Sequence, residues 1–112
     1  MTILETSKEL SGAEKYFLSK SPEIRRMKEI SNEEVQPDIW MIYSDTKSDG
    51  TEQEIFSMRT TDGEVYASNS KTFISDFRDI LECFNKEDIH TIKVVEGTSR
   101  AGRKFLKCAY IN

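Results

Sequence analysis

The stretch from Glu96 to Cys108, EGTSRAGRKFLKC, gathers positive charge around one aromatic side chain, Phe105. Glu96 is its single acid, and its four cations are Arg100, Arg103, Lys104 and Lys107. Guanidinium and ammonium groups bind phosphate oxygens, and an aromatic ring offers a flat face on which a base can stack. We therefore predict that this stretch clamps the backbone of a single-stranded nucleic acid. Gly97 and Gly102 would let its tip reach over the strand, because glycine tolerates backbone conformations that other residues resist.

The charge of the chain is unevenly distributed along its 112 residues. The formal net charge is −4, yet residues 93–112 carry a local charge of +4 and residues 1–92 sum to −8. Clustered cations are the electrostatic footprint of a binding site for an anionic partner. A plainer interpretation is that Lys and Arg only protect an exposed strand edge from pairing with other chains.

Other aromatic and basic residues could extend this site along neighbouring strands. Trp40 and Tyr66 join Phe105 as candidates for base stacking, with core burial as the alternative for each, and for Trp40 the two interpretations stay open. The full set of predicted nucleic-acid-binding residues is Trp40, Lys47, Arg59, Tyr66, Lys71, Lys93, Arg100, Arg103, Lys104, Phe105 and Lys107.

Catalytic and metal-binding patterns are weak in this chain. His90 is the only histidine, no serine has a nucleophile-elbow context, and phosphate-binding glycine motifs are absent. Cys83 and Cys108 lack the spacing of zinc ligands and are typical of buried thiols in a reducing compartment. We expect no enzyme activity, no metal and no cofactor. The start of the chain is too acidic for a signal peptide and no apolar run has membrane-spanning length, so we expect a cytoplasmic protein that does not bind membranes.

Sequence periodicity predicts the elements that position these residues. Apolar residues three, four and seven apart predict a helix from Ser70 to Phe84. Residues 24–30 alternate loosely and could form a strand with a basic face. Alternation and β-branched content predict strands over residues 39–44, 52–60, 64–68, 89–96 and 104–112.

The order of these elements, three strands, one helix and two strands, indicates a mainly β fold. We predict a five-stranded antiparallel barrel of the OB type, in which the amphipathic helix covers one end, and an open α+β sheet is the alternative. The domain would span residues 24–112, preceded by an arm or short helix over residues 1–23 that starts near Ser11.

Two segments together resemble a known family. DGEVYASNSKTF, followed by a helix and then IKVVEGTSRAGRKFLKCAY, resembles the single-stranded DNA-binding proteins of small phages of Gram-positive bacteria. The resemblance covers roughly residues 62–110. It implies an OB-like fold and a non-catalytic role in phage DNA replication, in which the protein coats exposed single strands and protects them. The implied partners are single-stranded DNA, bound without sequence preference, and replication proteins, in the cytoplasm of the host cell.

A compact acidic chain also fits a different class of function. The same fold could serve as a protein-interaction module, for example a phage-encoded inhibitor of a host factor, because a fold does not by itself determine function. Salt-sensitive binding to an oligonucleotide distinguishes the two hypotheses.

Overall fold

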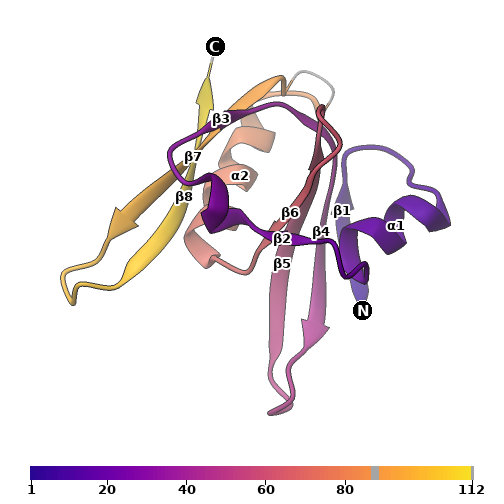
Figure 1. The fold of residues 1–112 in the computed structure, drawn as a ribbon, viewed down its shortest axis with the longest axis horizontal. Helices are drawn as coiled ribbons and strands as arrows, with labels where there is room; N and C mark the ends of the chain where they lie inside the picture. The colour runs from indigo at the N-terminus through magenta and orange to yellow at the C-terminus, as the bar shows by residue number, and fades with distance from the viewer. Residues whose placement is uncertain (87–88, 112) are drawn as a thin grey trace.

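The computed structural model describes residues 1–86 and 89–111 of the chain (Figure 1). In these residues it has eight strands, two α-helices and one 3-10 helix. In chain order they are β1 (Thr2–Thr6), α1 (Gly12–Ser19), β2 (Arg25–Arg26), η1 (Met27–Ile30), β3 (Glu34–Val35), β4 (Pro37–Thr46), β5 (Glu52–Thr60), β6 (Val65–Ser68), α2 (Lys71–Cys83), β7 (Thr91–Thr98) and β8 (Lys104–Ile111).

The strands form two sheets. One has the order β1-β4-β5-β6-β2 and is antiparallel except for the β2–β6 pair, and the other has the order β3-β7-β8 and is antiparallel throughout. The prediction of a mainly β fold is confirmed, as is the order of three strands, one helix and two strands over β4–β8.

The prediction of a five-stranded closed barrel is wrong. A barrel would close only if the outer strands of the β4–β5–β6 meander paired with the β7–β8 ribbon. Instead, β1 pairs with β4, β2 pairs with β6, and β3 pairs with β7. Because a strand edge has one set of free hydrogen-bonding groups, these short strands leave two open sheets over the described residues.

The middle of β4, from Ile39 to Tyr43, is buried on both faces, which explains its continuous apolar sequence. The side chains of Trp40, Phe56 and Phe77 meet on the face covered by α2, with ring centroids of Phe56 and Phe77 4.6 Å apart. A second cluster on the opposite face includes Leu18 of α1 and Met41 of β4.

Helix α2 occupies almost the full range predicted for it. Ser70 caps its start, since the Ser70 hydroxyl accepts a hydrogen bond from the Phe73 amide at 3.3 Å, and the same hydroxyl donates to the Leu106 carbonyl at 2.9 Å. The Asp76 carboxylate accepts from the Cys108 amide at 3.1 Å. These two contacts fasten the first turns of α2 to β8.

Residues 1–30 add structure that the sequence pattern only partly indicates. Helix α1 begins after Ser11, as expected, with a capping box between Ser11 and Glu14. The strand predicted over residues 24–30 is confined to β2 and then becomes η1. Met27 and Ile30 are three residues apart and both are buried, and a 3-10 helix places such a pair on one side.

Candidate nucleic-acid interface

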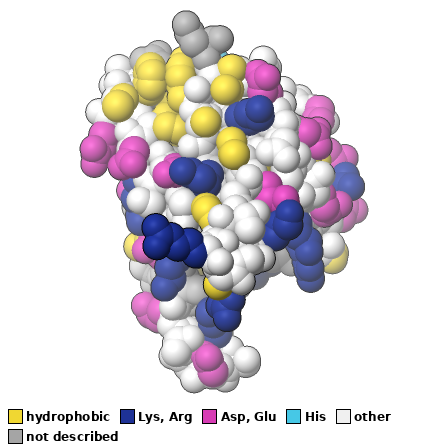
Figure 2. Space-filling model, turned by 90° about the vertical axis from the view of Figure 1, so that its left-hand side faces the viewer, with side chains coloured by type: hydrophobic (Ala, Val, Ile, Leu, Met, Phe, Trp, Pro, Cys, Tyr) yellow, Lys and Arg dark blue, Asp and Glu magenta, His cyan; other side chains and the backbone are white. Residues whose placement is uncertain are grey.

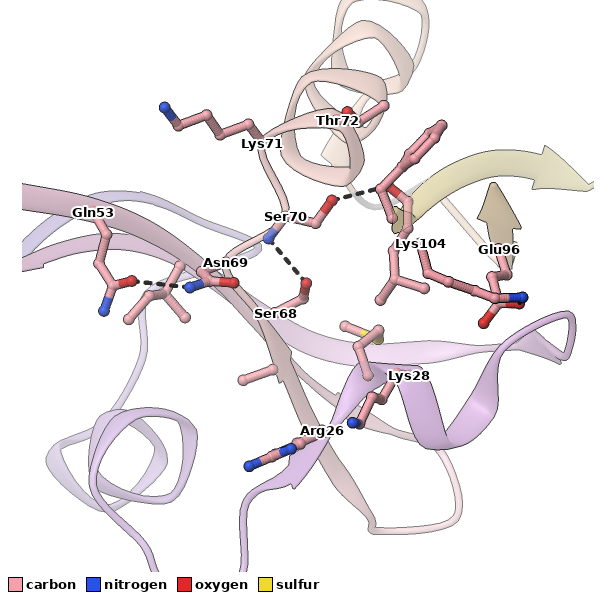
Figure 3. A pocket seen from close by; sticks show the side chains of 15 residues that line it. Arg26, Lys28, Gln53, Ser68, Asn69, Ser70, Lys71, Thr72, Glu96 and Lys104 are labelled. Carbon is pink, nitrogen blue, oxygen red and sulfur yellow. Dashed lines mark hydrogen bonds and ion pairs between the residues drawn. The ribbon is translucent and has the colours of Figure 1, made fainter. Parts of the chain in front are cut away.

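An open groove of about 720 Å³ lies where β2, η1, β5 and β6 face the start of α2 and the β7–β8 hairpin. Figure 3 shows it from close by, and Figure 2 shows the face of the molecule on the side of the hairpin, with Lys and Arg side chains gathered across its middle. The lining residues are Arg26, Met27, Lys28, Gln53, Ile55, Ala67, Ser68, Asn69, Ser70, Lys71, Thr72, Glu96, Lys104, Phe105 and Leu106.

Four cations and one acid line this groove. The Lys104 Nζ atom lies 2.9 Å from the Glu96 Oε1 atom, so the acid is paired with one of the cations. The structure as described contains no carboxylate oxygen within 4.0 Å of the charged groups of Arg26, Lys28 or Lys71. The groove therefore carries an excess of positive charge that is free to bind an anion.

Several cations on the large sheet and on α2 are paired with carboxylates. The Arg59 Nη2 atom lies 2.7 Å from an oxygen of Asp38, and the Arg78 Nη2 atom lies 2.7 Å from an oxygen of Glu54. Arg25, next to Arg26, pairs with Glu29 and Glu64, and Glu29 raises the pKa of Arg25. These pairs contrast with Arg26, Lys28 and Lys71 of the groove, for which no carboxylate partner lies within 4.0 Å in the described residues.

The hairpin between β7 and β8 turns through residues 99–103. The Ser99 amide donates to the Arg103 carbonyl at 2.8 Å, and Gly102 has a φ of +81°, which glycine adopts without strain. Arg100 and Arg103 are exposed on this tip. The cationic tip expected from the sequence is therefore present.

Gly97 has a different role from the one predicted. It lies within strand β7, directly opposite Phe105 on β8. A Cβ atom at position 97 would lie 2.6 Å from Cζ of the Phe105 ring, closer than carbon atoms can approach. Gly97 therefore makes room for the half-buried Phe105 ring to lie across the ribbon, and does not belong to the turn.

Successive side chains of β8 point to opposite faces of the two-stranded β7–β8 ribbon, so the basic residues of this ribbon are divided between the two faces. Lys104 shares a face with the buried Leu106, whereas Lys107 shares the face of Phe105. Lys93, opposite Ala109, lies on the same face as Lys107. Both lysines thus flank Phe105 along the strand, but only Lys107 lies on the same face as its ring.

Five predicted residues lie at the groove or at the hairpin tip. Lys71, Lys104 and Phe105 line the groove, and Arg100 and Arg103 form the tip. Lys47 is exposed in the β4–β5 turn and borders a neighbouring hollow that it shares with Lys71.

Three predicted residues, Trp40, Tyr66 and Arg59, do not line the groove. Trp40 is 2% exposed and Tyr66 is 7% exposed, because both point from their strands into the core beneath α2. Neither ring has a free face for a base. Arg59 points to the opposite face of the sheet, where Asp38 and Glu14 hold it.

Sequence reasoning missed the groove residues on β2, η1 and β5. Arg26, Lys28 and Gln53 line the groove, together with Asn69, whose Nδ2 donates to the Gln53 Oε1 at 3.0 Å. The loose alternation of residues 24–30 indicated a basic face and was the available signal, but it did not show which surface that face would join.

Comparison with known proteins identifies the family. Residues 31–109 match the family model described as phage single-stranded DNA-binding protein. The chain belongs to this family. Two members are the single-stranded DNA-binding proteins of Bacillus phages PZA and phi29, each 33% identical over 64 residues. The aligned part covers 55% of this chain and 52% of each relative, so the chain spans about half the length of the curated relatives it matches. No solved structure gave a significant match.

Metal-ligand clusters and membrane-spanning helices are absent from residues 1–86 and 89–111 of this phage single-stranded DNA-binding protein family member. These residues contain no group of three or more His, Cys, Asp or Glu side chains placed to hold a metal ion. Neither of their α-helices is both long enough and apolar enough to cross a bilayer.

Proposed function

We propose that this protein binds single-stranded DNA without sequence preference and coats exposed strands during phage DNA replication, in the cytoplasm of the host cell and without catalysis. The observation that carries this proposal is the meeting of uncompensated cations from separate elements at one groove, in a chain of net charge −4. Family membership supports the same ligand, since both curated relatives are named single-stranded DNA-binding proteins.

The β7–β8 hairpin would supply the main phosphate contacts. Arg100 and Arg103 extend into solvent at its tip, and planar guanidinium groups can bind phosphate through two parallel hydrogen bonds. Lys71 and Lys104 would continue the contacts into the groove, and Lys93 and Lys107 would do so around the outer face of the ribbon. Lys47 on the β4–β5 turn would contact the phosphates of a DNA strand long enough to extend beyond the groove.

Phe105 would contribute a stacking surface at the rim of the groove. Gly97 holds one side of the ring close to the ribbon, which limits its motion before DNA binds. Stacking on an aromatic ring is tolerant of base identity, because every base has a π face. Contacts to phosphates and a single stacking ring therefore favour binding that is independent of sequence.

The shape of the site suggests an open variant of the OB fold. The β4–β5–β6 meander, α2 and the β7–β8 hairpin follow the OB element order, and OB folds bind oligonucleotides across the middle strands of the sheet and the adjoining loops. Here the groove crosses β5 and β6 beside the β7–β8 hairpin. We infer that opening the barrel preserved this binding position.

Fluorescence anisotropy with a labelled oligo-dT, measured over a range of salt concentrations, tests the proposal. The wild-type protein should bind, and the affinity should fall as salt rises. The double variant Arg100→Ala/Arg103→Ala should flatten the slope of log affinity against log salt by about 1.4, since each phosphate contact on a single strand contributes about 0.7. Competition by unlabelled oligo-dA and mixed sequences should be similar to competition by oligo-dT.

A matched control removes two charges from helix α1 and its C-terminal cap, which do not line the groove. Lys15→Ala/Lys20→Ala on and beside α1 changes the net charge equally but lies away from the groove. A wild-type protein that leaves oligo-dT free at low salt would contradict the proposal. The hypothesis of a protein-interaction module would then gain support, and the exposed aromatic pair Tyr16 and Phe17 on α1 would be its first candidate surface.

A further inference from the structure

The β2–η1 segment forms one wall of the groove and lies outside the residues that match the family model. Residues 31–109 match that model, whereas Arg26 and Lys28 precede them. These two cations therefore belong to a part of the site that membership of the family does not account for.

Burial of their neighbours directs both cations to the groove. Met27 is 1% exposed and Ile30 is 6% exposed, so the apolar side of η1 faces the core. The Glu29 carboxylate accepts a hydrogen bond from the Arg26 amide at 3.1 Å and fixes the start of η1. Arg26 and Lys28 are left on the exposed side and line the groove, where Figure 3 shows them below its centre.

In the part of the chain that the structure describes, the acidic residues near the groove do not form ion pairs with Arg26 or Lys28. Glu29 and Glu64 instead pair with Arg25: the Arg25 Nη2 atom lies 3.1 Å from Glu29 Oε1, and the Arg25 Nη1 atom lies 3.6 Å from Glu64 Oε2. The structure over its described ranges places no carboxylate within 4.0 Å of Arg26 or Lys28. Two adjacent cations therefore face the groove without an acidic partner.

The position of this wall relative to the hairpin is set by Asn32. Its backbone amide donates to the Val94 carbonyl, and its side-chain oxygen accepts from the Glu96 amide at 3.3 Å. Asn32 has a φ of +67°, a conformation that asparagine adopts more readily than most residues. The residues that follow η1 are thus attached to β7, and the two walls of the groove are held at a fixed separation.

We propose that Arg26 and Lys28 are phosphate-binding residues, and that a single DNA strand runs through the groove between the β2–η1 wall and the β7–β8 hairpin. The strand meets Lys104 and Lys71 on one side and Arg26 and Lys28 on the other. This inference rests on the proposed function, because it extends the same site to a second wall. The groove floor offers hydroxyl and amide groups, among them Ser68 and Asn69, that can hydrogen-bond to the backbone of the strand.

The test compares three double variants that each remove two positive charges: Arg26→Ala/Lys28→Ala, Arg100→Ala/Arg103→Ala and Lys15→Ala/Lys20→Ala. Binding to fluorescent oligo-dT is measured by anisotropy at several salt concentrations. The Arg26/Lys28 variant should bind roughly tenfold more weakly at 0.1 M salt and flatten the salt slope by about 1.4, because two phosphate contacts are lost. The Lys15/Lys20 variant should stay close to wild type.

Folding is checked for each variant by circular dichroism and urea unfolding. If the alanine variant unfolds, Arg26→Gln/Lys28→Gln, which keeps a longer polar side chain without the charge at each position, is measured instead. An Arg26/Lys28 variant that is folded and matches the Lys15/Lys20 control, while the Arg100/Arg103 variant is weakened, would overturn this inference and leave the proposed function standing. Absence of oligo-dT binding by the wild-type protein would overturn both.

Discussion

Gly97 and Phe105 form a single unit on the β7–β8 ribbon. They are directly opposite each other in the register, and the absence of a side chain at position 97 lets the Phe105 ring lie against the neighbouring strand. An aromatic ring held in this way loses little conformational freedom when a base stacks on it, which favours affinity.

Replacement of Phe105 by Ala should weaken oligo-dT binding by about 1–3 kcal/mol, the range for loss of one stacked base. Phe105→Tyr, which keeps the flat ring, serves as the control and should retain most of the affinity. Anisotropy titration measures both variants, and urea unfolding confirms that they are folded. Equal affinity of Phe105→Ala and wild type would show that the ring has only a structural role.

Glu96 is the one acid among the residues that line the groove, and its ion pair with Lys104 would compete with a bound phosphate. Glu96→Gln should strengthen oligo-dT binding and steepen the salt slope by up to about 0.7, because Lys104 becomes free for one phosphate. Stability should change little, since exposed ion pairs contribute about 0–1 kcal/mol. Glu9→Gln, an exposed acid far along the chain from the hairpin, is the matched control. Weaker binding by Glu96→Gln would mean that the ion pair organises the site.

At the scale of the element, α2 joins the core to the site. Its buried side carries Phe73, Ile74, Phe77 and Ile80, while its first residues line the groove. Hydrogen bonds from Ser70 and to Asp76 attach these first turns to β8. The position of Lys71 relative to the hairpin therefore depends on how α2 packs against the large sheet.

Phe77→Ala should destabilise the protein by about 3–5 kcal/mol, because it removes a fully buried ring that contacts Trp40 and Phe56. Urea unfolding measures this loss. Ser75→Ala on the exposed side of the same helix is the control and should have little effect. Under conditions where Phe77→Ala is folded, oligo-dT affinity should remain that of wild type, since Phe77 does not line the groove. An unchanged urea midpoint would mean that α2 does not depend on this ring for its attachment.

At the scale of the molecule, the large sheet and the ribbon have different electrostatic roles. Acidic residues pair with Arg59, Arg78 and Lys20 around the large sheet, whereas the groove and the hairpin keep free cations. An acidic protein can thus gather Lys and Arg side chains on one face, as across the middle of the face in Figure 2, while acidic side chains dominate elsewhere in the sequence.

Stability of the whole fold should fall at alkaline pH. Burial, with a smaller contribution from Asp76, raises the pKa of the Cys108 thiol from 9.0 to about 12, and burial also raises the pKa of Tyr43 and Tyr66. The folded protein keeps these groups neutral, while the unfolded chain releases their protons once the pH exceeds the ordinary values. The free energy of unfolding should therefore be unaffected by these groups below about pH 9 and should decrease as the pH rises toward 12.

Urea unfolding at pH 7, 9 and 10.5 measures this decrease. At pH 10.5 the Cys108 thiol alone should account for on the order of 1–2 kcal/mol, because one pKa unit corresponds to about 1.4 kcal/mol. Cys108→Ala should reduce the decrease between pH 9 and 10.5. Cys83→Ala, which replaces the exposed cysteine, should leave it as in wild type. A fold whose stability is constant up to pH 10.5 would contradict the burial of Cys108.

Local sequence patterns were sufficient for most of the individual elements. The predicted helix and the strands at residues 39–44, 52–60 and 104–112 correspond closely to α2, β4, β5 and β8. Helical spacing, alternation and turn residues are properties of neighbouring positions, and therefore they can be read without knowledge of the fold. The cationic tip of the hairpin was predictable for the same reason, because Arg100 and Arg103 surround a turn that excludes them from any core.

Only the tertiary structure decided which of these residues can act together. Trp40 and Phe105 are both aromatic residues of predicted strands, yet Trp40 is enclosed by α2 and Phe105 is not, because burial depends on what packs above a strand. Arg59 is occupied by Asp38, which lies 21 positions away in the sequence. Arg26 and Lys28 reach the groove because β2 pairs in parallel with β6, about forty positions further along the chain. Pairings of this kind also determined the two open sheets, since β1, β2 and β3 occupy edges that barrel closure would have required, and long-range pairing has no local sequence signature.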